Sequence, residues 1–368
     1  MKKRTAIQLG QAAIGVGAAT LAYGLVHAHS YRLRRRSMLI PSDDVGPLRI
    51  LHISDAHTLV RHSKRISFLR DLGDCKPDLV VATGDMIAED EALAPVLDAL
   101  DSLLDVPGVF VFGSNDYVAP VFKNPLRYLV GPSNRKLGVE SDNDAVPLAW
   151  REMRSAFMNR SWVDLNNKRA RLEVAGWTLD FVGVDDPHMD YDHFPAPQPS
   201  PTDGVNGPYA RIGVTHAPYT RVLDQMVDDG CSLIFAGHTH GGQVCLPGGR
   251  ALVSNCDLDP KLASGLFQWP LEADVRADSS QPDDNSQAED NLPSGSGSQP
   301  GSNAQPGSSG TGEPVLIKGD GAAIAKDAPG SAWVQVSAGI GASTYAPVRT
   351  FCPPEAILLD IVPVGSRA

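Results

Sequence analysis

The chain lacks several features that would assign it to a function class directly. Only five of its 368 residues are cysteines and none stands in a CxxC pair, so small buried thiols are expected before a disulfide framework or a thiolate metal site. The net charge is −11 and no long basic stripe is present, so duplex nucleic acid is not expected as a partner. Bound divalent metals would offset acidic charge locally, so this acidity does not exclude a phosphorylated substrate.

Large apolar residues are almost missing from one internal stretch, residues 271–314. This stretch is rich in Ser, Gly and Pro, and it holds eight acidic residues against one arginine. Such a composition cannot bury enough surface to offset the entropy of ordering the chain. We therefore predict a disordered acidic insert at 271–314.

The N-terminus has a mild apolar run between two basic groups. Lys2, Lys3 and Arg4 precede a run over residues 5–28, and an arginine cluster at 32–36 follows. The run is long enough to span a bilayer as one helix, so residues 1–36 are predicted to be a single-pass N-terminal anchor in the cell membrane. A cleaved signal peptide and a buried core helix are the alternatives. Positive charge on both flanks leaves the orientation open.

The folded part is expected to begin near residue 47. Short apolar runs of strand length alternate there with helical patterns, which indicates an α/β architecture with buried sheets. The predicted catalytic domain covers 47–270, and residues 315–368 supply closing strands after the insert. The expected strands are 48–53, 79–82, 109–112, 179–184, 212–215, 233–236, 333–336 and 357–361.

Polar residues with metal-binding side chains follow five of these strands. In an α/β sheet, ligands bind outside the carboxyl ends of the strands. Asp, Asn and His offer the oxygen and nitrogen donors that suit Mn, Zn, Fe or Mg. In Asp-x-His and His-x-His, alternate side chains lie on the same side of an extended backbone and can reach one centre. The five motifs are Asp55-Ala56-His57, Gly84-Asp85, Gly113-Ser114-Asn115-Asp116, Thr215-His216 and Gly237-His238-Thr239-His240-Gly241-Gly242.

The series DAH, GD, GSND, TH and GHTHGGQ resembles the signature of calcineurin-like metallophosphoesterases, especially the bacterial branch with one N-terminal membrane helix. The resemblance runs from about Leu48 to Val244, and a closing segment near Val336 also resembles that branch. It implies a four-layer αββα sandwich with two divalent metal ions. By this resemblance one metal is held by Asp55, His57 and His240, the other by Asn115, His216 and His238, and Asp85 bridges both.

One position departs from the usual pattern of the family. Many members have His after the Asn, whereas this chain has Asp116. Asp116 is predicted to be a catalytic general acid if burial or nearby carboxylates raise its pKa; otherwise it orients a neighbour. Asp185, Asp186 and His188 follow another strand, and a polar loop is their default interpretation.

The expected function is hydrolysis of phosphate mono- or diesters by a hydroxide shared between two metals. The predicted membrane anchor favours a lipid-linked phosphate as the substrate. The alternatives are a membrane-tethered phosphoesterase acting on soluble nucleotides and a catalytically weak metal-binding scaffold. A metallo-β-lactamase-like hydrolase is disfavoured because the string HxHxDH is absent.

Overall fold

The computed structural model describes residues 2–42, 45–120, 146–199, 207–271, 315–325 and 330–364. The predicted acidic insert therefore lies outside the described residues, apart from its first residue, Leu271.

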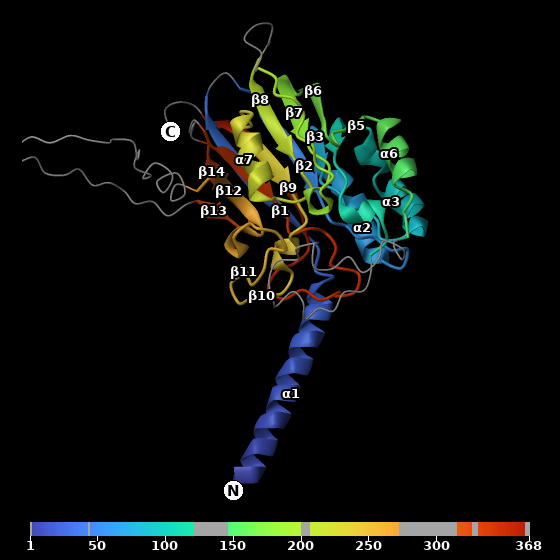
Figure 1. Cartoon of the computed structure of the whole chain (residues 1–368), viewed down its shortest axis with the longest axis vertical. Helices are drawn as coiled ribbons and strands as arrows, with labels where there is room; N and C mark the ends of the chain where they lie inside the picture. The colour runs from blue at the N-terminus through green and yellow to red at the C-terminus, as the bar shows by residue number, and fades with distance from the viewer. Residues whose placement is uncertain are drawn as a thin grey trace, which may run out of the picture.

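Helices and strands alternate along most of the described chain (Figure 1). The α-helices are α1 (Lys2–His27), α2 (Ser63–Asp71), α3 (Leu93–Ala99), α4 (Asp101–Leu104), α5 (Ser114–Tyr117), α6 (Trp150–Met158) and α7 (Thr220–Asp228). Short 3₁₀ helices are η1 (Leu72–Cys75), η2 (Asp90–Ala92), η6 (Pro187–Met189), η7 (His240–Gly242) and η8 (Pro260–Leu262). The strands before the insert are β1 (Arg32–Pro41), β2 (Leu48–Ile53), β3 (Leu79–Ala82), β4 (Gly108–Phe110), β5 (Trp162–Asp164), β6 (Lys168–Val174), β7 (Trp177–Gly183), β8 (Tyr209–Val214), β9 (Leu233–Ala236), β10 (Cys245–Leu246), β11 (Arg250–Ala251) and β12 (Gly265–Trp269). Those after it are β13 (Leu316–Ile317), β14 (Gly321–Ile324), β15 (Ala332–Val336) and β16 (Glu355–Val364).

Two seven-stranded sheets form the centre of the molecule. The first has the order β14-β1-β16-β2-β3-β4-β5, and the second has the order β13-β12-β15-β9-β8-β7-β6. Strands β2 to β5 pair in parallel, and so do β7, β8, β9 and β15. Parallel strands are buried on both faces, which explains why they read as continuous apolar runs in the sequence.

The two sheets pack face to face, and helices cover their outer faces. Along β2, Ile50 joins the apolar core shared with the second sheet, whereas Leu51 joins the core under α2, α3 and α6. On the far side, Ile234 and Val334 of the second sheet pack with Met226 of α7. The resulting helix–sheet–sheet–helix order agrees with the expected αββα arrangement.

The arginine cluster after α1, predicted as the basic flank of an anchor, forms part of β1. That strand pairs with β16 and β14 inside the first sheet. Arg36 is fully buried and donates to Gln335 Oε1 at 2.8 Å and to the Lys318 carbonyl at 2.9 Å. A buried guanidinium is tolerated because these acceptors replace water. The sheet sandwich therefore begins at Arg32, and the expected boundary near residue 47 is too late.

The apolar run at the N-terminus forms α1, which projects from the body (Figure 1). Ala and Gly are common in this helix, and large apolar side chains are few. Within the described part of the chain, no helix has the length and apolarity needed to cross a bilayer. The expected transmembrane anchor is therefore not supported.

Candidate metal centre

The predicted metal-binding side chains come from the carboxyl ends of five strands, three in the first sheet and two in the second. Asp55 and His57 follow β2, Asp85 follows β3, and Asn115 lies in the short helix α5 after β4. The second sheet supplies the other three, which are His216 after β8 and His238 and His240 after β9. Because the two sheets pack together, these ends meet at one edge of the sandwich.

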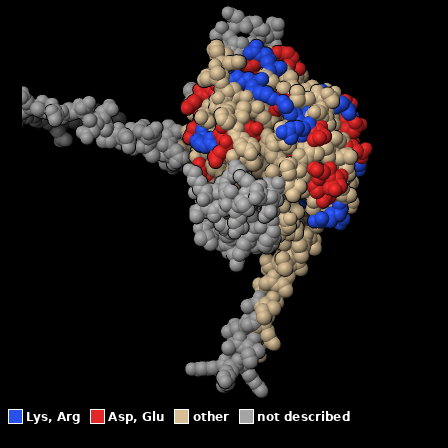
Figure 2. Space-filling view, turned by 45° about the vertical axis from the view of Figure 1, so that its right-hand side comes forward, with Lys and Arg blue, Asp and Glu red and all other residues tan. Residues whose placement is uncertain are grey.

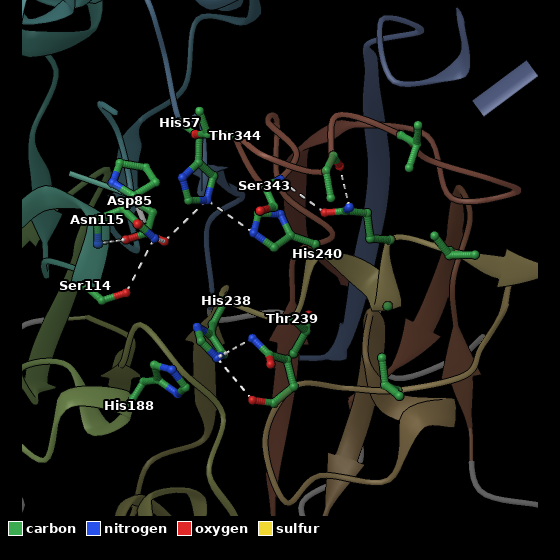
Figure 3. Close-up of a pocket in the computed structure, with 18 of the residues that line it drawn as sticks. His57, Asp85, Ser114, Asn115, His188, His238, Thr239, His240, Ser343 and Thr344 are labelled. Carbon is green, nitrogen blue, oxygen red and sulfur yellow. Dashed lines mark hydrogen bonds and ion pairs between the residues drawn. The ribbon is translucent and has the colours of Figure 1, made fainter. Parts of the chain in front are cut away.

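One group of donors forms around His57. The ligand atoms of Asp55, His57 and His240 all lie within 4.8 Å of one another. The Nε2 atom of His57 is 3.2 Å from Nε2 of His240 and 3.3 Å from Oδ2 of Asp85 (Figure 3). This is the group that the family resemblance assigned to one metal.

A second group forms around His216. Its Nε2 atom lies 3.3 Å from Nδ1 of His238 and 3.6 Å from Oδ2 of Asp85. Asn115 donates from Nδ2 to the same Asp85 oxygen at 2.8 Å. Asp85 therefore contacts both groups, as its assignment as the bridging ligand requires.

The protonation states of these groups suit metal binding. Burial lowers the pKa of His57 to about 4, and burial with neighbouring histidines lowers the pKa of His238 and His240 well below the usual value. Neutral imidazole is the form that binds a metal. Burial acts to raise the pKa of Asp85, but His216 and His57 outweigh it, so this pKa lies below its usual value and Asp85 stays ionised.

His216 is the exception among the four histidines. Burial lowers its pKa, but Asp85, Asp186 and Asp55 outweigh that effect and raise the pKa to about 9. The three carboxylates thus favour a positive charge at this position of the cluster. A bound divalent cation would supply that charge instead. Donors of this kind fit Mn, Fe or Zn, because they combine carboxylate oxygens with imidazole nitrogens.

The backbone at the site is held in unusual conformations. Five of the seven predicted ligands have left-handed φ angles between 41° and 68°, namely Asp55, His57, Asp85, His238 and His240. A non-glycine residue in this region is strained, and such residues concentrate at functional sites. The surrounding sheets therefore stabilise backbone turns that place these five side chains.

Two glycines leave room for the ligands. A Cβ at Gly237 would lie 1.9 Å from Ser54 Oγ and 2.5 Å from Oδ2 of Asp55, and one at Gly113 would lie 2.4 Å from Oδ1 of Asp85. No side chain fits at either position without displacing a carboxylate. The motif glycines are thus explained by close approach to the donors.

A cavity of about 550 Å³ opens over the donors. We call its metal-binding and histidine lining the polar half, which consists of His57, Asp85, Asn115, His188, His238 and His240. We call its aliphatic lining the apolar half, which consists of Val118, Ala119, Pro120, Val244, Leu252, Ala346 and Val348. Further polar residues also line the cavity, namely Ser114, Thr239, Gln243, Asn255, Ser343 and Thr344. No Lys or Arg stands among the described residues that line the cavity.

The carboxylate of Asp116, predicted as a catalytic acid, faces backbone N–H groups and not the cavity. It is fully buried and is not among the residues that line the cavity. Its carboxylate accepts backbone N–H bonds from Asp85 at 2.6 Å, Met86 at 2.7 Å and Gly113 at 3.0 Å. Although burial and Asp85 raise the pKa of Asp116 to about 7, this geometry favours the orienting role over proton transfer to a substrate.

One of the polar residues that follow β7 lines the cavity, although a polar loop was their default interpretation. After β7, His188 lines the cavity with its ring centroid 4.5 Å from that of His238, and its Nδ1 lies 3.1 Å from the Tyr219 hydroxyl. Asp186 holds this turn by accepting the His188 N–H at 2.8 Å. The signal in the sequence was the same as for the ligands, a polar group directly after a strand.

Two further contributors lie outside the five motifs. The backbone carbonyl of Asn255 lies 3.3 Å from Nε2 of His238, and it comes from a loop without any motif. Arg349 is fully buried and donates to the carbonyl oxygens of Ala338, Gly341 and His240 rather than facing the cavity. Arg349 therefore fixes the loop that carries His240.

Comparisons with known proteins agree with this geometry. The profile of the calcineurin-like phosphoesterase family matches residues 48–242, more than half of the chain. The chain is 27% identical over 201 residues to the uncharacterized protein YpbG of Bacillus subtilis (strain 168), and 26% identical over 205 residues to the uncharacterized metallophosphoesterase YkoQ of the same organism. Each of these alignments covers 54% of this chain but only 63% of the relative, so the chain spans less than two thirds of both relatives.

A third relative carries a more specific name. The chain is 27% identical over 263 residues to UDP-2,3-diacylglucosamine pyrophosphatase LpxG of Chlamydia trachomatis. That alignment covers 61% of this chain and 75% of the relative.

Proposed function

The chain belongs to the calcineurin-like phosphoesterase family, and on that premise we propose that it hydrolyses phosphoric esters with two divalent metal ions. The family resemblance drawn from the five motifs is thereby confirmed, though not its restriction to the membrane-anchored branch. One observation carries the proposal: Oδ2 of Asp85 lies 3.3 Å from His57 Nε2 in one donor group and 3.6 Å from His216 Nε2 in the other. A weak metal-binding scaffold is disfavoured because all seven donors are retained.

Each donor group would hold one cation, with Asp85 between them. When bound, the two cations would lower the pKa of water to supply a nucleophile and would neutralise charge on the phosphoryl oxygens. The chain itself contributes the rest. Asn115 donates a hydrogen bond to Asp85 and holds its carboxylate in place. Asp116 fixes the backbone of Asp85 by accepting its N–H bond.

His188 is placed to act on the substrate rather than on a metal. Its ring lines the cavity beside His238, while Nδ1 contacts the Tyr219 hydroxyl. An imidazole at this position can donate a hydrogen bond to a phosphoryl or leaving-group oxygen. We assign it that positioning role in place of the histidine that the chain lacks after Asn115.

A lipid-linked phosphate is our preferred substrate class. The named substrate of the Chlamydia relative is a diacylated sugar nucleotide, and half of the present cavity is apolar. A free nucleotide would find no Lys or Arg among the described lining residues to pair with its other phosphates. The cavity therefore favours a substrate that carries an apolar part beside the reacting phosphate.

Metal reconstitution tests the proposal. The full chain is stripped with a chelator and reloaded separately with Mn, Zn, Fe or Mg, and hydrolysis of a 4-nitrophenyl monoester and a diester is followed. We expect activity with at least one metal and its loss in His238→Ala, while His193→Ala, which changes an exposed histidine, retains it. Equal activity in wild type and His238→Ala, or no hydrolysis with any of the metals, would overturn the proposal.

A further inference from the structure

The apolar half of the cavity exposes large aliphatic side chains that a folded protein usually buries. Val244 is 43% exposed and Leu252 is 46% exposed, although both line a cavity beside buried metal-binding groups. Contiguous apolar surface around a cavity marks a binding site rather than a random exposed residue. This surface has no role in the metal chemistry described above.

The wall that carries these side chains is built by two segments far apart in the sequence. Gln243 Nε2 donates to the Ala346 carbonyl at 2.7 Å, and the Ser343 N–H donates to Gln243 Oε1 at 3.1 Å. Val244 and Thr350 also form a parallel β-bridge. These hydrogen bonds fix the two segments to each other, so the part of the apolar half with Val244, Ala346 and Val348 is preformed.

Outside the cavity the apolar surface continues toward α1. Val348 lines the cavity, and its Cβ lies 3.4 Å from where a Cβ on Gly24 of α1 would stand. The Arg349 N–H donates to the Gly24 carbonyl at 3.0 Å, and the rings of Tyr23 and Phe351 are 5.5 Å apart. Figure 2 shows charged side chains over the body and none on the part of α1 next to it, and residues 5–27 of this helix hold no Lys, Arg, Asp or Glu. An apolar group leaving the cavity at Val348 would therefore meet the uncharged part of α1.

From these observations we propose that the apolar half binds the alkyl or acyl chain of a phosphoester whose phosphate lies at the metal centre. The placement of the phosphate at the metal centre rests on the proposed function. The placement of the alkyl or acyl chain rests on this apolar surface alone. The aliphatic side chains of the apolar half offer no hydrogen-bond partners to a polar sugar or peptide, although Gln243, Ser343 and Thr344 also line the cavity. An extended apolar chain buries this surface and needs none.

Chain length gives the expected size of the effect. Burial of one methylene contributes about 0.8 kcal/mol, which corresponds to about a fourfold change in affinity. Affinity should therefore rise about fourfold for each added methylene until the cavity is filled. Beyond that length it should level off.

The experiment measures two quantities on the full chain. Hydrolysis is followed with ethyl, hexyl and decyl 4-nitrophenyl phosphodiesters, and binding of monomeric decyl phosphate is followed by calorimetry with the chelator-treated protein. Leu252→Ser and Val244→Ser remove apolar surface from the cavity. The matched control is Leu246→Ser, because Leu246 of the nearby strand β10 is also 46% exposed but does not line the cavity.

We expect the decyl probes to bind more than tenfold tighter than the ethyl probes, and Leu252→Ser to lose most of that gain while Leu246→Ser keeps it. Hydrolysis without any dependence on chain length, together with no calorimetric binding of decyl phosphate, overturns the inference and leaves the proposed function standing. Binding that depends on Leu252, without hydrolysis of any ester, supports the chain site and rejects the proposed function. Dimerisation that Leu252→Ser abolishes, with no chain-length effect, would assign the surface to a second copy and overturn the inference.

Discussion

The two halves of the cavity are built in different ways. The polar half consists of groups set directly after sheet strands, with buried side chains such as His238 and with left-handed backbones. The apolar half consists of loop residues such as Val244 and Leu252 that remain almost half exposed. Rigid strand ends hold reacting groups accurately, whereas loops can vary to fit a substrate.

This contrast leads to different expectations for mutation. A change to a predicted metal ligand of the polar half should act through metal binding and should be all-or-none, because each ligand is shared or tightly packed. A change in the apolar half should be graded with the area removed from the substrate. The predictions below test that contrast, beginning with the largest effect.

Replacement of the shared carboxylate should have the largest effect. Asp85→Asn removes the charge that both donor groups contact, so turnover of an aryl phosphate should fall by more than about 100-fold, the upper range for loss of an outer partner of a metal ligand. Metal content, measured by mass spectrometry of the dialysed protein, should fall in parallel. Full activity in this variant would show that Asp85 is not a metal ligand and would contradict the proposal that two donor groups share it.

Loss of space beside a donor should come next. In Gly237→Ala the new methyl would clash with Ser54 and with the carboxylate of Asp55, which overpacks the site by about 1–3 kcal/mol. We expect metal affinity, measured by competition with a chelator dye, to fall by about 5- to 100-fold, with activity restored in part at high metal concentration.

Gly319→Ala is the matched control for this variant, because nothing lies within 4 Å of a Cβ at that position. Metal affinity equal to that of the wild type in both variants would show that the backbone can shift without disturbing the ligands.

Much of the metal centre could be predicted from the sequence because its signals are local. The strands at 79–82 and 233–236 are confirmed at their predicted ends, and Asp85 and His238, which follow them, both lie next to His216. Short apolar runs predict buried parallel strands well, and the residues that follow such strands must lie at one edge of the sheet. The left-handed backbone of Asp55 or His240 has no such local signal.

The features that could not be predicted depend on contacts between residues that lie far apart in the sequence. The arginines of β1 suggested a lipid-facing flank, yet Arg36 is stabilised by Gln335 and by backbone carbonyls from after the insert. Likewise, the sequence left open whether Asp116 acts as a general acid or orients a neighbour, because nothing local shows that it accepts N–H bonds from the loop after β3. Partners far along the chain decide the role of a charged side chain in both cases.

Asp116 offers a test of that second point with a smaller effect. In Asp116→Asn one oxygen becomes an amide donor facing backbone N–H groups, and a charge-assisted hydrogen bond worth about 1.5–3 kcal/mol is lost. If Asp116 orients the Asp85 loop, the unfolding free energy from urea titration and the metal affinity should both decrease. A slower turnover with unchanged stability and metal affinity would instead support the proton-transfer role.

The smallest effect is expected at His188, where the polar half meets the substrate without contributing a metal ligand. His188→Ala removes one hydrogen-bond donor, worth about 1 kcal/mol, so kcat/KM should fall about fivefold while metal content stays at the wild-type value. His188→Gln, which keeps a side-chain donor, should recover part of that loss. A variant that loses metal would place His188 among the groups that support His238, and an unchanged kcat/KM in His188→Ala would show that the substrate does not reach this side of the cavity.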